Sequence, residues 1–262
     1  MLGVITVADW DSIQYLKFKT QRTQPSIDLV KRIDLSNPKK VIDIGCGPGN
    51  STNVLYERFQ NADILGVDYS KNMLEKAKAN YPKLHFAEFD ARNDVWDLDN
   101  DYDIVFSNAC IQWIPNHKEL LPKMMSLLRT GGVLAVQIPV QFNEPIHKII
   151  NEVSSRNCWK EKFNFKRIFN ILDDCEYYDI LSEVSSDFEM WQTTYYHKMN
   201  SHQEIIEWYK STGLKPYLDS LDGQDKEEFL NDVYNEIVKH YKIQKNGEII
   251  FKFPRLFFVA EK

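Results

Sequence analysis

The stretch Val41–Thr52, VIDIGCGPGNST, is the part of the sequence that decides the fold. A short apolar run leads into three glycines at alternate positions, and polar residues follow. This pattern predicts a buried strand, a tight turn and the start of a helix. Glycine permits the positive φ angles of such a turn and removes the Cβ atoms that would keep a ligand away from the backbone. The first N–H groups of the helix could then face an anion or a nucleotide cofactor, although a purely structural turn would have the same pattern.

Strands and helices alternate on the C-terminal side of this turn. Up to Pro139, apolar runs of strand length alternate with helical patterns, which predicts parallel βαβ units with helices on both faces of a doubly wound sheet. The expected strands are Lys40–Ile44, Asp63–Asp68, Leu84–Phe89, Tyr102–Ser107 and Val133–Ile138, and the expected helices are Asn50–Phe59, Ser70–Asn80 and His117–Leu128. Ser70 is a candidate helix N-cap, and Gly131-Gly132 is a candidate turn into the fifth strand.

The second half of the chain is predicted to add helices and two more strands. The pattern is helical and irregular from Pro139 to Val184; the later elements expected are a strand at Phe188–His197, helices within Ser201–Tyr241 broken near Gly213 and Pro216, and a strand at Glu248–Ala260. Pro254 favours an edge strand or a bulge for the last of these. We therefore predict a single α/β domain over residues 1–262, with a mostly parallel seven-stranded sheet and helical cap segments near 1–34, 143–184 and 199–245.

Composition and charge narrow the class of protein. The 262 residues are 43% hydrophobic and carry a net charge of -6, so they can form a substantial core, and a nucleic-acid partner is disfavoured. No apolar run approaches the roughly 20 residues that span a bilayer. The first residues include Asp9 and Asp11 and lack the basic start of a signal peptide. The four cysteines have no metal-ligand spacing, which favours free thiols, no metal site and a cytoplasmic location.

Two residues bear on the choice of a nucleoside cofactor. Asn50 stands where the dinucleotide-binding pattern GxGxxG keeps its third glycine, which disfavours NAD and favours S-adenosylmethionine (SAM). Asp68 ends the second strand, about 20 residues beyond the loop, where a carboxylate can accept hydrogen bonds from both ribose hydroxyls. NAD sites and SAM sites share an acidic residue at this position. A helix-capping role for Asp68 before Ser70 is the structural alternative.

Polar residues also follow the third and fourth strands. The Asp90 carboxylate, followed by Ala91, could accept a hydrogen bond from an adenine amino group. Asn108, Gln112 and Trp113 follow the fourth strand. Because ligands bind outside the carboxyl ends of strands in open parallel sheets, we expect these side chains to lie at one ligand site.

The motifs VIDIGCGPGNST, GVDYS, FDARN and FSNACIQW resemble the class I SAM-dependent methyltransferases in order and spacing. The segments KFKTQRTQPSIDL, WQTTYYHKMNSHQEIIEWYKSTGLKPYL and NGEIIFKFPRLFFVAEK resemble the trans-aconitate 2-methyltransferase family, and the similarity runs from about Trp10 to the C-terminus. The glycine motif is specific only to the superfamily, whereas TTYYH, IIEW and FPRLF are more specific. Departures from the family are concentrated in Ser155–Cys175, within the expected cap.

The resemblance implies a Rossmann-like class I domain with a helical cap. Such an enzyme transfers the methyl group of SAM to a carboxylate of trans-aconitate or a related small polycarboxylic acid, which yields a monomethyl ester and S-adenosylhomocysteine (SAH). The cofactor contacts that it implies are Gly45, Gly47, Asn50, Asp68, Tyr69, Asp90, Ala91 and Asn108.

The chemistry of this reaction needs positioned cations and donors rather than a base. A carboxylate with a pKa near 4 is already ionised at neutral pH, so we expect no catalytic base. Arginine binds carboxylates bidentately, which makes Arg22 and Arg255 the first candidates for the substrate. The full set of candidate substrate residues is Arg22, Gln112, Trp113, Gln137, Tyr195, Tyr196, His197, Trp208 and Arg255. Strand alternation places Tyr195 and His197 on one face and Tyr196 on the other.

Three alternatives stay open at this point. The protein could methylate another small acid or a natural product, could be an NAD(P)-dependent oxidoreductase on a similar sheet, or could bind SAM in a regulatory role without turnover. The partner that we expect is a small polycarboxylate, with neither nucleic acid nor membrane. We expect a monomer or a weak homo-oligomer.

Overall fold

The computed structural model describes residues 19–93, 96, 98–140, 144–163, 165, 170–210 and 212–262. They divide into two compact units. The sheet unit comprises the described residues of Thr20–Val140, Ile168–Thr193 and Arg255–Lys262, and the helical unit those of Gln141–Arg167 and Thr194–Pro254. Of the segments expected to form the cap, residues 20–34 and 170–184 belong to the sheet unit, and residues 1–18 lie outside the described part of the chain.

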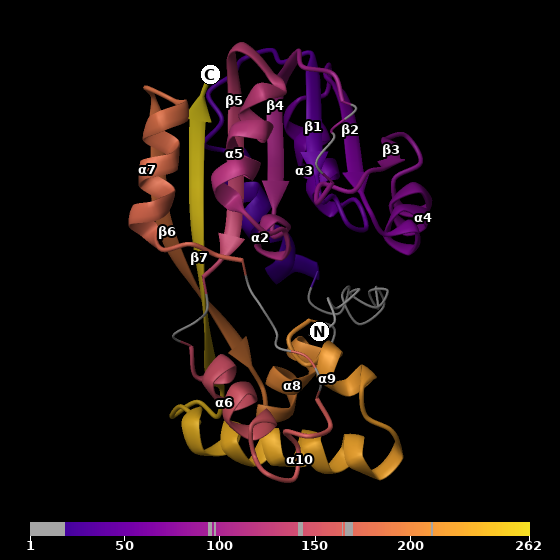
Figure 1. The fold of residues 1–262 in the computed structure, drawn as a ribbon, viewed down its shortest axis with the longest axis vertical. Helices are drawn as coiled ribbons and strands as arrows, with labels where there is room; N and C mark the ends of the chain where they lie inside the picture. The colour runs from indigo at the N-terminus through magenta and orange to yellow at the C-terminus, as the bar shows by residue number, and fades with distance from the viewer. Residues whose placement is uncertain are drawn as a thin grey trace. The chain divides into compact units, whose positions relative to one another are not determined.

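Seven strands form one sheet (Figure 1). They are β1 (Lys40–Ile44), β2 (Asp63–Asp68), β3 (His85–Glu88), β4 (Tyr102–Asn108), β5 (Leu128–Pro139), β6 (Phe188–Met199) and β7 (Ile249–Glu261). The helices that accompany them in the sheet unit are α2 (Lys19–Val30), α3 (Asn50–Arg58), α4 (Lys71–Asn80), the short 3-10 helix η1 (Ile111–Trp113), α5 (His117–Ser126) and α7 (Asp174–Val184).

The strand order is β3-β2-β1-β4-β5-β7-β6. The neighbouring strands from β3 to β5 pair in parallel, and β7 runs antiparallel to β5. The prediction of a mostly parallel, seven-stranded sheet is confirmed. The chain moves outward through β2 and β3 on one side of β1 and through β4 and β5 on the other, so the carboxyl end of β1 is the topological switch point, where such sheets bind ligands.

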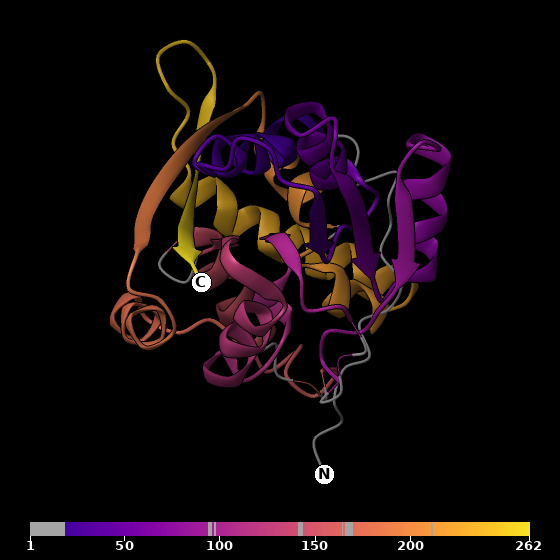
Figure 2. The ribbon, with the colours of Figure 1, turned by 90° about the horizontal axis from the view of Figure 1, so that it is seen from above.

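Alternation along β1 sends side chains to both faces of the sheet. Ile42 and Ile44 join a buried apolar cluster with side chains of α5 and α7. Asp43 lies on the opposite face, where it accepts hydrogen bonds from Ser51 and Thr52 of α3. Helices cover both faces of the sheet, as the view from above shows (Figure 2). Two-sided burial explains the apolar side chains of Val41, Ile42 and Ile44 in β1, whereas Asp43 is accommodated by its two hydroxyl donors.

A buried histidine joins α5 to α7 within the sheet unit. His117 Nε2 lies 2.8 Å from the carbonyl oxygen of Ile111, and Nδ1 lies 2.6 Å from the hydroxyl of Tyr177. Because a carbonyl only accepts, Nε2 donates its proton, and Nδ1 of the neutral ring accepts from the tyrosine. Burial lowers the pKa of His117, because removing the ring from water disfavours its charged form.

This histidine is expected to make stability depend on pH. The unfolded chain binds a proton at His117 below about pH 6.5, whereas the folded protein does not until a lower pH. The free energy of unfolding should therefore fall as the pH drops below 6.5, with a slope from this residue of up to about 1.4 kcal/mol per pH unit. Urea unfolding at pH 7.5, 6.5 and 5.5 measures the slope. His117→Gln should reduce this slope, whereas His85→Gln, at an exposed histidine, should not. Equal slopes in all three proteins would contradict the assignment of the pH dependence to His117.

Gly131-Gly132 is not the turn into β5, as the sequence predicted, but lies within the strand. Tyr102 of β4 pairs with Leu128 and Ile104 pairs with Val133, so extra residues of β5 bulge between the two pairs. A Cβ at Gly132 would lie 2.9 Å from the carbonyl oxygen of Tyr102. Gly132 is therefore required by close backbone approach at the bulge, and Gly131 by its positive φ angle of +72°.

For Pro254 the sequence favoured an edge strand or a bulge, and the edge-strand alternative fails for β7 as a whole. β7 lies between β5 and β6. The antiparallel register with β5 ends at the pair Pro139 and Arg255, so Pro254 falls just past the last pair with that strand. An inner strand tolerates this proline because its missing N–H is not needed for a bond to β5.

The helical unit contains α6 (Pro145–Ser154), α8 (His202–Lys210), α9 (Lys215–Asp219) and α10 (Gly223–His240). The predicted break near Gly213 and Pro216 is confirmed, because α8 ends before the glycine and the proline lies in the first turn of α9. A buried aromatic cluster that includes Trp208, Phe229 and Phe251 forms the core of this unit. In the part of the chain that the structure describes, no helix is both long and apolar enough to cross a membrane.

Candidate functional site

The predicted glycine turn follows β1 directly. Gly45, Gly47 and Gly49 have φ angles of +77°, +54° and +88°, which confirms a turn that only glycine adopts easily. The N–H groups of Gly45 and Cys46 both donate to the carbonyl oxygen of Val67, at 2.8 and 3.0 Å. The end of β2 therefore holds the start of the loop in place.

The three glycines face different surroundings. A Cβ at Gly45 would lie 2.1 Å from Sγ of Cys110, and one at Gly49 would lie 2.8 Å from the ring of Tyr81. Among the described residues, no atom would lie within 4 Å of a Cβ at Gly47. Packing therefore requires glycine at the two outer positions, whereas the middle of the loop leaves its backbone open to a ligand.

Gly45→Ala is expected to lower the free energy of unfolding by about 2–5 kcal/mol, because a side chain there combines a left-handed backbone with overpacking against Cys110. Gly47→Ala is the matched control, since it has the backbone strain without the clash, and it should cost about 1–2 kcal/mol. Urea unfolding of both variants measures the difference. Similar losses in the two proteins would show that the contact with Cys110 is unimportant.

Asp68 connects the loop to the next helix. Its Oδ2 accepts from the N–H of Gly47 and its Oδ1 from the N–H of Ser70, each at 2.9 Å. Ser70 is itself the N-cap of α4, as predicted, because its hydroxyl accepts from the N–H of Met73. Asp68 is therefore not the N-cap residue. Burial raises its pKa, and the N–H groups that it accepts oppose that shift by favouring the ionised form.

Asn50, in place of the third glycine, contacts the far end of α4. Its Oδ1 accepts from the hydroxyl of Tyr81 at 3.0 Å. The same tyrosine ring blocks any Cβ at Gly49. The amide thus fixes the first turn of α3 against α4, which a glycine could not do.

Asp43 is a buried carboxylate to which the sequence analysis assigned no role. The hydroxyl groups of Ser51 and Thr52 donate to its Oδ2 at 2.6 and 2.7 Å, and Oδ1 has no hydrogen-bond partner among the described residues. Burial raises the pKa of Asp43 to about 6. An acidic residue inside an apolar strand, followed by two hydroxyl residues in the next helix, is the sequence signal that could have identified it.

The end of β3 is followed by a close ion pair. Arg92 donates from Nε to Oδ1 of Asp90 at 2.8 Å and from Nη2 to Oδ2 at 2.6 Å. The guanidinium lowers the pKa of Asp90. The central carbon of the Arg92 guanidinium, Cζ, lies 4.5 Å from the centroid of the Tyr69 ring. One arginine therefore contacts two of the predicted cofactor residues, Tyr69 and Asp90.

Several amide side chains lie at or just after the ends of β4 and β5. Asn108 and Gln137 are Cα partners in the ladder, and Arg255 Nη1 donates to Gln137 Oε1 at 3.2 Å. Gln112 Nε2 donates to the carbonyl oxygen of Ala109 at 2.7 Å. Three buried amide atoms at this edge have no hydrogen-bond partner in the described part of the chain: Asn108 Oδ1, Gln112 Oε1 and Gln137 Nε2. Because buried polar atoms rarely lack partners, they indicate a ligand site.

The predicted site residues divide between the two units. All eight candidate cofactor residues follow or end β1, β2, β3 and β4 in the sheet unit, and the candidate substrate residues Arg22, Gln112, Trp113, Gln137 and Arg255 belong to the same unit. Arg22 is buried in α2, Trp113 ends η1, and Arg255 is 5% exposed. The candidates Tyr195, Tyr196, His197 and Trp208 belong to the helical unit. The assignment of all these residues to ligands stays a prediction.

The aromatic candidates of the helical unit separate by strand alternation, as predicted. The rings of Tyr195 and His197 stack with centroids 6.2 Å apart, and His197 stacks on Trp208 at 4.9 Å. Tyr196 is 63% exposed on the other face of β6, where Lys252 Nζ lies 5.9 Å from its ring. Tyr196 is therefore an outer-face residue and does not belong to the aromatic cluster.

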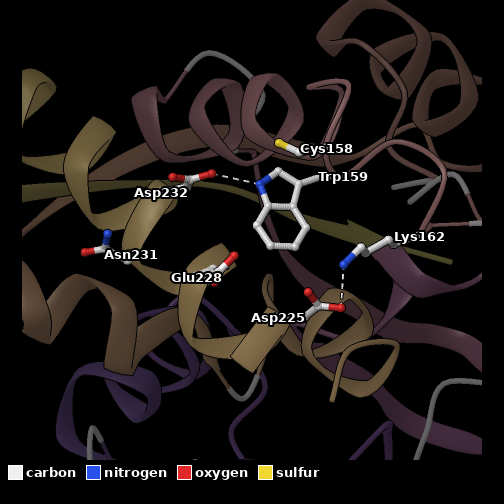
Figure 3. A pocket seen from close by; sticks show the side chains of 7 residues that line it. All are labelled: Cys158, Trp159, Lys162, Asp225, Glu228, Asn231 and Asp232. Atoms are coloured by element: carbon white, nitrogen blue, oxygen red, sulfur yellow. Dashed lines mark hydrogen bonds and ion pairs between the residues drawn. The ribbon is translucent and has the colours of Figure 1, made fainter. Parts of the chain in front are cut away.

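A cavity of about 230 Å³ lies within the helical unit (Figure 3); it is lined by Cys158, Trp159, Lys162, Asp225, Glu228, Asn231 and Asp232. Its polar groups mostly satisfy one another. Trp159 Nε1 donates to Asp232 at 2.8 Å, and Lys162 forms an ion pair with Asp225 at 2.5 Å. Over the described residues, no group of His, Cys, Asp or Glu side chains is arranged to hold a metal ion.

Comparison with known proteins identifies the family. A family model for a methyltransferase domain matches residues 35–213. Trans-aconitate 2-methyltransferases of Escherichia coli and Shigella flexneri are 41% identical to the chain over 256 residues, which cover 98% of this chain and 99% of theirs. The chain belongs to the trans-aconitate 2-methyltransferase family. The resemblance expected from the TTYYH and FPRLF segments is thereby confirmed along the full length of this methyltransferase.

Solved structures agree with the fold of this methyltransferase. The YcgJ protein of Bacillus subtilis has a TM-score of 0.60 at 14% identity, covering 91% of this chain and 98% of its own. A phosphoethanolamine N-methyltransferase of Haemonchus contortus, solved with S-adenosyl-L-methionine, has a TM-score of 0.54 at 17% identity, covering 91% of this chain and 52% of its own. At these identities the likeness supports the class I methyltransferase fold alone.

Proposed function

We propose that the protein transfers the methyl group of SAM to a carboxylate of trans-aconitate or a closely related polycarboxylic acid, releasing the monomethyl ester and SAH. Membership of the trans-aconitate 2-methyltransferase family supports the reaction. The observation that carries the proposal is the buried edge at Gln137, where an arginine orients an amide whose N–H groups have no partner in the described part of the protein.

The residues around the glycine loop fit the nucleoside of SAM. The backbone at Gly47 is open on its Cβ side, and the Asp68 carboxylate lies beside it at the end of β2. Asn108 Oδ1 is buried without a partner in the described residues. We assign Asp68 to the ribose hydroxyls, Asp90 to the adenine amino group and Asn108 to a donor group of the cofactor. When bound, SAM supplies a methyl group on a positively charged sulfur.

The acid is assigned to the donors at the end of β5, Gln137 and Arg255. Arg255 is a permanent cation that is almost fully buried, and a buried cation is stabilised by an anion. Its bond to Gln137 Oε1 turns the Nε2 amino group of Gln137 away from Arg255, so both side chains can donate to carboxylate oxygens. A tricarboxylate needs several such donors, which a protein with a net charge of -6 must concentrate at one site.

In the proposed reaction the protein positions its substrate and transfers no proton. The attacking carboxylate is ionised at neutral pH. The donors orient one carboxylate oxygen and remove its water, and both effects lower the barrier of an in-line displacement at carbon. Neutral His117 is buried with both ring nitrogens occupied, so it takes no part in this chemistry.

Titration calorimetry with SAM, SAH and NAD tests the cofactor. We expect SAM and SAH to bind and NAD to give no heat; binding of NAD alone would exclude a methyltransferase. Steady-state turnover with trans-aconitate, cis-aconitate, citrate and isocitrate then tests the acid. The highest kcat/KM is expected for trans-aconitate, and binding of SAM without turnover on any acid would favour a regulatory SAM-binding protein.

We further propose that the two units form one functional methyltransferase domain in the cytoplasm, as a monomer or weak homo-oligomer without a nucleic-acid partner. The acidic net charge supports the last point. The four cysteines, Cys46, Cys110, Cys158 and Cys175, are all free thiols, which suits a reducing compartment.

A further inference from the structure

Arg92 joins two residues that the proposed function assigns to the cofactor. Tyr69 follows β2 and Asp90 follows β3. Arg92 places its guanidinium 4.5 Å from the ring centroid of Tyr69 and donates through two nitrogens to both carboxylate oxygens of Asp90. Its own backbone N–H also donates to Asp90 Oδ1, at 3.0 Å. The sequence analysis did not assign Arg92 to the site.

The three hydrogen bonds from Arg92 leave one acceptor position of the Asp90 carboxylate for another donor. A carboxylate has about four lone-pair positions. Two donors from Arg92 occupy both positions on Oδ1 and one donor occupies a position on Oδ2, so one position on Oδ2 has no donor among the described residues. The bidentate contact also fixes the plane of the carboxylate. Asp90 therefore presents one acceptor in a defined direction and, because its carboxyl is ionised at neutral pH, no donor.

We propose that Arg92 is a positioning residue that selects a cofactor whose base carries an amino group. This assignment rests on the proposed function, in which Asp90 accepts from the adenine of SAM. Arg92 orients Asp90 so that the remaining lone pair accepts an N–H group and repels a carbonyl oxygen. Its cation–π contact holds Tyr69 in the adjoining position.

A merely structural ion pair would behave differently. Arg92 and Asp90 are 39% and 29% exposed as side chains, and pairs at such exposure contribute little to folding stability. Loss of Arg92 should therefore leave thermal stability nearly unchanged while it changes base selectivity. The pair Arg129 and Asp103 in the same unit is a suitable comparison, since it too joins a half-exposed arginine to an aspartate but lies near the start of β4.

The test compares SAH with S-inosylhomocysteine, in which an oxo group replaces the adenine amino group. Calorimetry should show that the parent protein prefers SAH. Arg92→Met should weaken SAH binding by about tenfold and leave S-inosylhomocysteine nearly unchanged, because one oriented charge-assisted hydrogen bond is lost. Arg92→Lys should restore little, since lysine does not form the planar bidentate contact. Arg129→Met should keep the parent's preference.

The outcomes separate the two proposals. If the parent protein binds no SAH, the proposed function fails, and the role of Arg92 fails with it. If the parent prefers SAH and Arg92→Met keeps that preference in full, the role of Arg92 alone is overturned. Equal weakening of both ligands, together with a lower melting temperature, would also overturn it, because that result is typical of a structural ion pair. In Asp90→Asn, removal of Arg92 should cause no further loss of SAH affinity.

Discussion

Asp68→Ala is expected to weaken SAH binding by about 100- to 1,000-fold. Each hydrogen bond from a ribose hydroxyl to an ionised carboxylate is worth about 1.5–3 kcal/mol, and the proposed site has two. The alanine would also remove the acceptor that holds the N–H of Gly47, so the loop would lose its fixed position beside the ligand. The loss should appear in the dissociation constant measured by titration calorimetry.

Two further variants make the result specific to Asp68. Asp63 begins the same strand with an exposed side chain, so Asp63→Ala should bind SAH as the parent does. Asp68→Asn keeps one acceptor for Gly47 and should fall between the parent and Asp68→Ala. If Asp68→Ala, shown to be folded by its melting transition, bound SAH within about threefold of the parent, the assignment of Asp68 to the ribose would be wrong.

Arg255→Met is expected to raise the KM for trans-aconitate by about 100-fold and to leave the dissociation constant of SAH nearly unchanged. Removal of one partner from a buried charged hydrogen bond costs about 2–5 kcal/mol, and the variant also releases the amide of Gln137. Methionine keeps the length of the side chain, which limits the cavity. Steady-state kinetics at saturating SAM measures the change.

Gln137→Met removes the partnerless donor without removing the cation. A rise in KM of about tenfold is expected, because one hydrogen bond to the acid is lost. Arg32→Met is the matched control, since that arginine is exposed and pairs with Glu189 at the surface. An unchanged KM in both Arg255→Met and Gln137→Met would place the acid elsewhere in the protein.

The strands whose ends were predicted best are those that have a strong local sequence pattern. β1 and β2 begin and end at the predicted residues because each contains a short group of Val, Ile or Leu residues and is followed by a clear turn or cap signal, Gly45 after β1 and Ser70 after β2. The prediction of a turn at Gly131-Gly132 was wrong, because the backbone of Tyr102, which requires a glycine at position 132, comes from a distant part of the chain. Pro254 favoured an edge strand or a bulge, but the register between β7 and β5, which no local pattern gives, decides where a proline is tolerated in this strand.

In the candidate site, too, some features follow from neighbouring residues and others from contacts between distant parts of the chain. The positive φ angles of the glycine loop follow from local sequence, and so does the cap at Ser70. The orientation of Gln137 depends on Arg255, which lies 118 residues away in the chain. Arg92 is close to Asp90 in sequence, yet its contact with Tyr69 depends on the pairing of β2 with β3. No spacing rule along the chain encodes such contacts.

Methyl transfer from labelled SAM to trans-aconitate tests the proposed function most directly. Label should enter the acid in a product that mild base hydrolyses, because a carboxylate oxygen is the methyl acceptor and the product is an ester. cis-Aconitate, citrate and isocitrate should accept less label under the same conditions. A base-stable product would place the methyl group on another atom, and no transfer to any of the four acids by a protein that binds SAH would contradict the account.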